Sequence, residues 1–178
     1  GWLWSPDGRR IVFVQVDQSM IRSIPIVDYM PYYSKVHMIK YPKSGEENWS
    51  LRIGTIHLET WKTTWLDFDK DLDVYYPRLK WTRDPDKVAV ERLNRGQNRL
   101  ELFFADVVSG EVRLVLTETD PFWVRIDDDL TFLEGSDRFI WTSPRSGYKH
   151  AYLYDYDGHM VNQITTGEWE INAARAPY

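Results

Sequence analysis

The sequence predicts an all-β fold of repeated four-stranded antiparallel sheets, and two observations support this prediction. One phrase recurs in register at residues 4–13, 81–90 and 132–141: an aromatic residue, a polar turn, a basic residue and an apolar run. No window of about a dozen residues keeps a helical period, whereas β-rich runs alternate with turn residues. A hairpin repeated in register is typical of stacked sheets. The sequence therefore predicts about three blades of a β-propeller, which usually has roughly four to eight.

The first predicted blade covers roughly residues 2–67, with apolar runs at 11–16, 36–41 and 51–58 after a short opening strand. It is long because residues 17–34 are inserted between its second and third strands. Prolines flanked by apolar and aromatic residues predict that the insert is an extended, packed arm. We expect its segment Tyr29–Tyr33 to cover a sheet face or to contact a second subunit, which makes a homodimer possible.

The second and third predicted blades are shorter and more regular. They cover residues 73–118, with strands at 74–81, 87–93, 100–106 and 112–117, and residues 129–166, with strands at 130–133, 138–142, 151–156 and 160–165. The repeat predicts burial at equivalent places for the aromatic residues Trp4, Trp81 and Phe132 and for their partners Ile11, Val88 and Phe139. Because three blades cannot close a ring, we also expect exposed apolar sheet faces and self-association.

Composition excludes several classes of function. The 178 residues carry a formal net charge of −5, which argues against binding nucleic acid or an anionic membrane. The absence of cysteine excludes disulfides, thiolate catalysis and Cys-ligated zinc. No run approaches the ~20 apolar residues of a membrane-spanning helix. Both ends of the sequence resemble interrupted strands, so we expect a segment of a longer protein.

The acidic run at residues 67–73 spaces its carboxylates two apart, as calcium loops do, and a second acidic run lies at residues 127–129. An EF-hand needs Gly and Glu where the first run has Leu72 and Arg78, so both runs are interpreted as solvated turns. Paired carboxylates also suit glycoside hydrolysis, but no spacing here singles out an acid and a nucleophile. We expect no metal and no cofactor.

The basic and histidine residues are interpreted as structural. The histidines His37, His57, His150 and His159 are scattered, without the spacing of a zinc helix. His150 is expected to form hydrogen bonds at a strand start. Arg92, Arg95 and Arg99 are interpreted as a solvated loop tip, with a contact to a neighbouring domain or subunit as the alternative.

Several motifs together resemble a known family. They are Trp4-Ser5-Pro6-Asp7-Gly8, Gln15-Val16-Asp17, Tyr41-Pro42-Lys43-Ser44-Gly45, Gly147-Tyr148-Lys149-His150 and Thr165-Thr166-Gly167-Glu168-Trp169-Glu170. In this order they resemble the dipeptidyl peptidase IV family of prolyl-oligopeptidase-type serine exopeptidases, in its bacterial form. The resemblance spans residues 4–170.

The resemblance implies a parent with an eight-bladed propeller and a C-terminal α/β-hydrolase domain. The parent would remove N-terminal Xaa-Pro dipeptides, or tripeptides, and a periplasmic or secreted location is favoured. This chain would be a noncatalytic segment that walls and gates the substrate cavity. The serine motif Gly-x-Ser-x-Gly does not occur in it, and Glu46-Glu47 does not match the family's substrate-binding glutamate pair. The alternative is a propeller module for binding or scaffolding, without an attached peptidase.

The resemblance also points to candidate site residues. Phe122-Trp123-Val124-Arg125 resembles a Trp-Val-x-Arg stretch beside a propeller loop that projects toward the active site. Phe122, Trp123 and Arg125 are therefore candidates for the substrate cavity. The alternative is a cluster at a strand edge that packs against the next blade.

Overall fold

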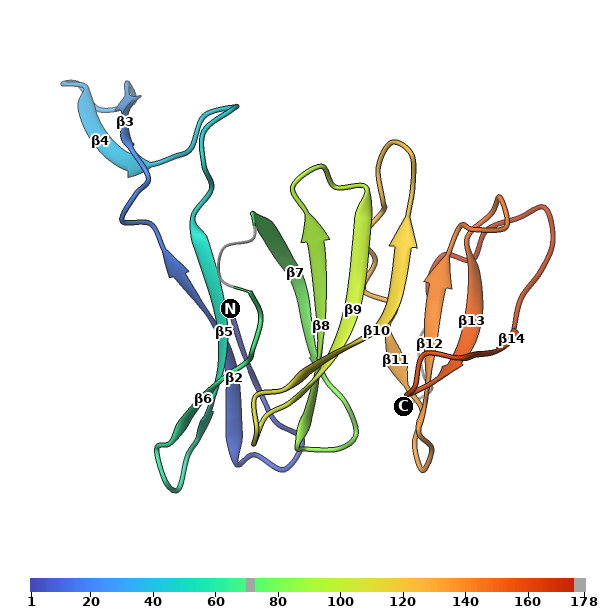
Figure 1. The fold of residues 1–178 in the computed structure, drawn as a ribbon. Coiled ribbons are helices and arrows are strands. Elements are labelled where there is room, and N and C mark those ends of the chain that lie inside the picture. The colour runs from blue at the N-terminus through green and yellow to red at the C-terminus, as the bar shows by residue number, and fades with distance from the viewer. Residues whose placement is uncertain (70–72, 175–178) are drawn as a thin grey trace.

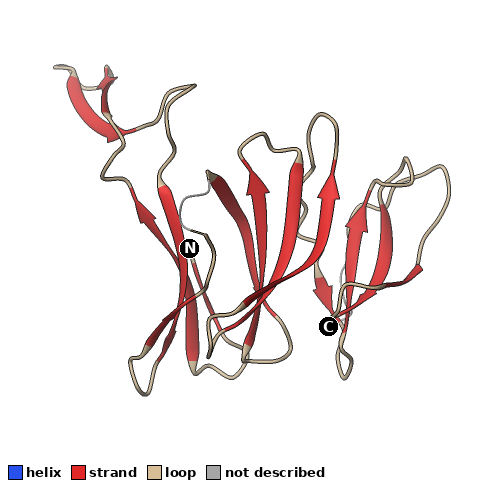
Figure 2. Cartoon of the chain, viewed as in Figure 1, coloured by secondary structure: helices blue, strands red, loops and turns tan. Residues whose placement is uncertain are grey.

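The computed structural model describes residues 1–69 and 73–174, and every regular element in them is a strand (Figures 1 and 2). The strands form three four-stranded antiparallel sheets and one separate hairpin. The first sheet contains β1 (Trp2–Trp4), β2 (Arg10–Asp17), β5 (Ser50–His57) and β6 (Thr63–Trp65). The second contains β7 (Val74–Trp81), β8 (Lys87–Asn94), β9 (Arg99–Asp106) and β10 (Val112–Thr119). The third contains β11 (Thr131–Phe132), β12 (Arg138–Ser143), β13 (His150–Asp155) and β14 (Met160–Gln163).

The predicted repeat is confirmed by the strand register. The aromatic residue that ends the first strand of each sheet pairs with the predicted apolar residue at the start of the second. The three pairs are Trp4 with Ile11, Trp81 with Val88, and Phe132 with Phe139. Equivalent hairpins therefore open all three sheets.

The expected burial holds for two of the three aromatic residues. Trp81 and Phe132 are 9% and 4% exposed, because each points toward the preceding sheet. The indole Nε1 of Trp81 donates to the carbonyl oxygen of Leu3 at 3.2 Å, and the Phe132 ring lies 5.9 Å from that of Phe104. The prediction is wrong for Trp4, which is 53% exposed. Trp4 occupies the equivalent place on the first sheet, whose outer face no other described sheet covers.

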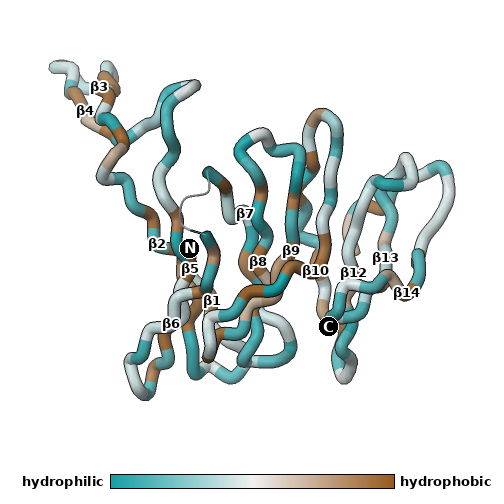
Figure 3. Tube along the Cα trace, in the orientation of Figure 1, coloured by the Kyte–Doolittle hydropathy of each residue, from teal (hydrophilic) through white to brown (hydrophobic). Residues whose placement is uncertain are grey.

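Apolar residues on both faces of the second sheet fill the two spaces between the sheets. Figure 3 colours the Cα trace by hydropathy and shows apolar residues along β8, β9 and β10. Successive strand residues point to opposite faces, so β8 turns Val88 and Val90 toward the first sheet and Ala89 and Leu93 toward the third. A strand that is buried on both faces has a continuous run of apolar residues, whereas a strand with one exposed face alternates apolar and polar residues. Glu91, in the middle of that run, is the exception and is also buried.

The long insertion differs from the prediction. Residues 36–41 were predicted as the third strand of the first blade, but β4 (Lys35–Lys40) pairs only with β3 (Ser23–Asp28) in a hairpin that projects from the sheet (Figure 1). The third strand is instead β5, which pairs with β2 over eight consecutive residues, and the fourth is β6. All six residues of β4 are exposed, so its apolar side chains do not join the core.

Candidate functional site

The candidate residues lie in the loop between β10 and β11, at the end of the sheets where the β8–β9 turn also lies (Figure 1). Phe122 is 89% exposed and Trp123 is 56% exposed, so neither packs as a core residue. The loop contacts Gln97 of the β8–β9 turn. The Trp123 indole donates to the Gln97 side-chain oxygen at 3.1 Å, and the Val124 amide donates to the Gln97 carbonyl at 2.8 Å.

Asp120 fixes the start of this loop. Its Oδ1 accepts hydrogen bonds from the backbone N–H groups of Phe122 at 2.7 Å and Trp123 at 3.0 Å. These bonds favour the ionised carboxylate and lower the pKa of Asp120. The two aromatic side chains are thus presented to solvent on an ordered turn.

Arg125 pairs with an acidic residue of the same loop. Its Nε lies 3.3 Å from Oδ1 of Asp127, in an ion pair that is half exposed. The structure therefore places Phe122 and Trp123 on one turn, whereas Arg125 belongs to the charged second half of the loop. The alternative was a cluster at a strand edge that packs against the next blade. Val124 is buried as that alternative requires, whereas Phe122 and Trp123 are exposed.

A buried lysine holds the second half of the loop. Lys149 is 3% exposed, and its Nζ lies 2.6 Å from Asp129 and 2.9 Å from Asp127. Burial alone lowers the pKa of Lys149, but the hydrogen bonds to Asp129 and Asp127 outweigh it and the pKa is raised. The interpretation of residues 127–129 as a solvated turn is wrong for Asp129, which is 7% exposed. Its partner Lys149 lies in the Gly-Tyr-Lys-His motif. This motif is the only sequence signal that pointed to Lys149.

His150 has the structural role that the sequence predicted. It is 1% exposed, its Nδ1 lies 3.1 Å from the Thr165 hydroxyl, and its Nε2 lies 2.9 Å from the Gly167 carbonyl. The ring also contacts Trp169 edge-on, with centroids 5.3 Å apart. The two C-terminal motifs of the sequence therefore meet around one histidine. A Cβ at Gly167 would lie 2.3 Å from the Trp169 indole, so this packing requires glycine.

The other charged clusters are mainly structural. Arg92 was predicted at a solvated loop tip, but it lies on β8, 2.7 Å from Glu101 on β9, so that interpretation is wrong for it. Residues 70–72 of the acidic run at 67–73 lie outside the described residues. Within residues 1–69 and 73–174, no group of three or more His, Asp or Glu side chains is placed to hold a metal ion. No helix in that part of the chain could span a membrane.

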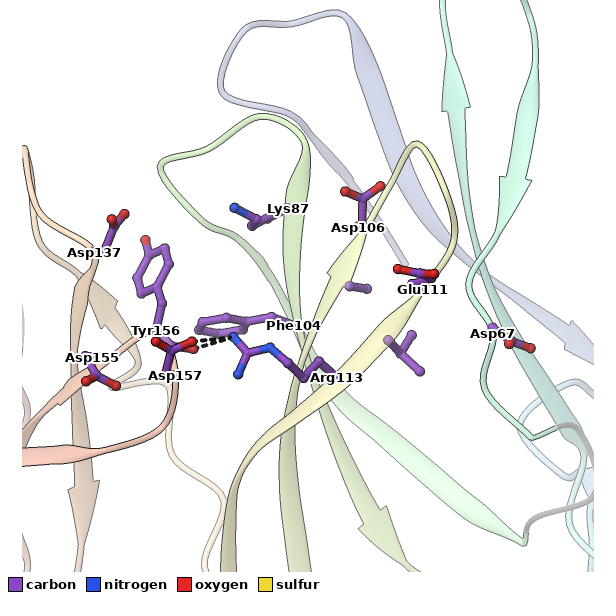
Figure 4. Close-up of a pocket in the computed structure, with 12 residues that line it drawn as sticks. Asp67, Lys87, Phe104, Asp106, Glu111, Arg113, Asp137, Asp155, Tyr156 and Asp157 are labelled. Carbon is purple, nitrogen blue, oxygen red and sulfur yellow. Dashed lines mark hydrogen bonds and ion pairs between the residues drawn. The ribbon is translucent and has the colours of Figure 1, made fainter.

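A cleft of about 680 Å³ lies between the second and third sheets, at the turns opposite the candidate loop (Figure 4). Acidic side chains predominate in its lining. Arg113 crosses it to the Tyr156 carbonyl at 2.6 Å and to Asp157 at 3.7 Å. Asp106 accepts hydrogen bonds from the backbone N–H groups of Ser109 and Val108. Both bonds lower the pKa of Asp106, and the bond from Ser109 has the larger effect. Its carboxylate thus stabilises a turn.

Comparison with known proteins identifies the chain. The family model described as "Dipeptidyl peptidase IV (DPP IV) N-terminal region" matches residues 1–176. The "Probable dipeptidyl-aminopeptidase B" of Emericella nidulans is 28% identical over 196 residues, which cover 94% of this chain and 21% of that protein. The "Inactive dipeptidyl peptidase 10" of Rattus norvegicus is 25% identical over 183 residues, which cover 94% of this chain and 23% of that protein.

A solved structure agrees with these sequence matches. The crystal structure of Porphyromonas gingivalis dipeptidyl peptidase 4 superposes with a TM-score of 0.86 at 30% identity, over 97% of this chain and 25% of that one. The chain thus spans about a quarter of the length of its relatives. It belongs to the family of dipeptidyl peptidase IV N-terminal regions, and its sheets are blades of a propeller fragment.

Proposed function

We propose that this chain is a noncatalytic propeller segment of a dipeptidyl-peptidase-IV-like serine exopeptidase. The parent would combine an eight-bladed propeller with an α/β-hydrolase domain and remove N-terminal Xaa-Pro dipeptides or tripeptides. The observation that carries the proposal is the β10–β11 loop, where Asp120 fixes the backbone of the turn, Gln97 accepts from the Trp123 indole, and both aromatic side chains remain exposed. Exposed aromatic residues on an ordered turn are suited to contact a peptide.

In this proposal the loop walls and gates the substrate cavity. Phe122 and Trp123 supply apolar area, and Arg125 supplies a charge that Asp127 already orients. The buried Lys149 beneath the loop keeps its second half in place. Gating here means limiting the size of the peptide that enters.

The test uses the full-length protein and a chromogenic Xaa-Pro substrate. Replacing Phe122 and Trp123 together by Ala should raise KM about tenfold with little change in kcat, because the contact serves ground state and transition state alike. Trp61→Ala is a matched control, since Trp61 is 69% exposed on the β5–β6 turn. An unchanged KM in the double variant would contradict the proposed contact of this loop with the substrate. The 178-residue chain alone should not cleave Gly-Pro or Ala-Pro substrates.

A binding or scaffolding module remains the second candidate, because one relative carries the name "Inactive dipeptidyl peptidase 10". The downstream sequence distinguishes the two. A Gly-x-Ser-x-Gly motif followed by Asp and His predicts the peptidase, and loss of that serine predicts the binding module.

We also propose that the β3–β4 hairpin contacts a second subunit. Its exposed side chains include Tyr29, Met30, Tyr32 and Tyr33, which are 77–94% exposed. Apolar groups at this density normally find a partner. Sedimentation over a range of concentrations should show self-association that Tyr32→Glu with Tyr33→Glu weakens. Self-association that survives this change would instead come from the outer face of the first sheet, around Trp2 and Trp4.

A further inference from the structure

Glu91 is buried without the partner that a buried carboxyl group normally has. It lies in the middle of β8, opposite Arg78 on β7 and Leu102 on β9, and it is 3% exposed. Its Oε2 has no hydrogen-bond partner among the described residues. Buried polar groups are nearly always hydrogen-bonded, so this atom needs an explanation.

The unpartnered oxygen belongs to a residue that lines a pocket of about 280 Å³. The pocket is formed by β1, by β7 and β8 of the second sheet, and by the segment that precedes β11. Its aliphatic walls are Leu3, Leu79, Ala89 and Leu130. A space of this size accepts a fragment of about one or two amino-acid residues, near the lower limit of ordinary ligand sites.

The charges around the pocket balance one another. Arg78 forms an ion pair with Asp128, and Asp127 lies 2.9 Å from Lys149. The Nζ of Lys80 donates to the carbonyl oxygen of Leu130. The pocket lining thus has two cationic side chains and two aspartates in addition to Glu91.

Glu91 itself is uncharged at neutral pH. Burial raises its pKa to about 8 and outweighs Arg78, the next largest cause, which lowers it; Asp128 and Asp127 act with burial, and Lys80 acts against it. The pocket therefore presents a protonated carboxyl group between aliphatic walls, and its lining has no net charge to attract an ion. Burying a charged ligand there would cost more than burying a neutral one.

We propose that this pocket binds an uncharged aliphatic amide, such as an internal peptide unit with a small aliphatic side chain. A protonated carboxyl group offers one donor and one acceptor side by side, and an amide offers the matching acceptor and donor. The aliphatic part of the ligand would contact Leu79 and Leu130. This site does not depend on the proposed peptidase activity, so an absent hydrolase domain would leave it intact.

The first test compares three probes of nearly equal size. N-acetyl-L-leucinamide is neutral, N-acetyl-L-leucine is an anion, and L-leucinamide is a cation at neutral pH. The neutral probe should bind the chain with a Kd on the order of millimolar and shift the backbone NMR signals of residues 78–80 and 89–91. The charged probes should bind at least about tenfold more weakly. Equal binding of all three, or no shifts, would overturn the proposal.

The second test uses variants of Glu91. Glu91→Leu should abolish binding, whereas Glu91→Gln should retain it, because a carboxamide keeps one donor beside one acceptor. As pH rises through 8, the wild type should lose binding and Glu91→Gln should not. The other charged residues of the pocket are common to both proteins, so they cannot produce that difference. Binding that is insensitive to Glu91→Leu would contradict the proposal, and so would coinciding pH profiles of binding for the wild type and Glu91→Gln. Glu111→Gln, in the distant cleft, is the control variant.

Discussion

Replacement of Glu91 by Gln should change how the stability of this chain depends on pH. Glu91 has a pKa of about 8 in the folded chain, against an ordinary value of 4.5. Between these values the folded chain retains a proton that the unfolded chain releases. The free energy of unfolding therefore falls as pH rises from 4.5 to 8, and above 8 the loss is complete.

The magnitude follows from the linkage between proton binding and folding. Each pH unit inside that window costs about 1.4 kcal/mol, so Glu91 lowers the stability by on the order of 3 kcal/mol at pH 7. Gln has nearly the same shape and does not ionise. Glu91→Gln should therefore match the wild type near pH 5 and exceed its stability by on the order of 3 kcal/mol at pH 7.

Urea unfolding followed by tryptophan fluorescence at several pH values measures this difference. Other groups also titrate, but they are common to both proteins, so the difference between the two pH profiles isolates Glu91. Equal m-values would show that both proteins unfold from similarly compact states. Glu111→Gln, which removes an exposed carboxylate, should parallel the wild type. Parallel profiles for Glu91→Gln as well would refute the assignment of a buried, protonated Glu91.

Three further predictions concern stability in urea. Trp81→Ala should lower the free energy of unfolding by about 3–5 kcal/mol, and Trp4→Ala by less than about 1 kcal/mol; similar losses would contradict their different environments. Gly158→Ala should cost at least about 2 kcal/mol, because Gly158 has a φ of +89° and a Cβ would lie 2.1 Å from the Val115 carbonyl oxygen; a neutral effect would contradict this close approach. Lys149→Met should cost about 2–3 kcal/mol, because it leaves the buried Asp129 carboxylate without its cation; unchanged stability would show that this carboxylate stays solvated.

The repeated hairpins could be predicted because their signal is local. The aromatic residue, the turn and the apolar run lie within about ten residues, and the turn sets the pairing of Trp81 with Val88. The role of residues 36–41 could not be predicted in this way, because an alternating strand looks the same in a sheet or in a free hairpin. Only the longer pairing of β2 with β5 decides between the two.

The details of the candidate loop depend on contacts that its own motif does not contain. The motif at 122–125 located the loop, but the exposure of Phe122 depends on hydrogen bonds from its turn to Asp120. The burial of Asp129 depends on Lys149, which is distant in sequence. The sequence analysis did not single out Glu91, although its position pointed to burial. It faces the same side of β8 as Ala89 and Leu93, which are both buried.

The second and third sheets are each built from four strands that follow one another directly along the chain. During synthesis, all the strands of one sheet leave the ribosome before the first strand of the next. Each sheet can therefore complete its backbone pairing alone, because the loops to be closed are short. Packing against the preceding sheet then follows as a separate step. A translational pause between residues 119 and 131 would give the second sheet time to form before the third competes for its exposed face.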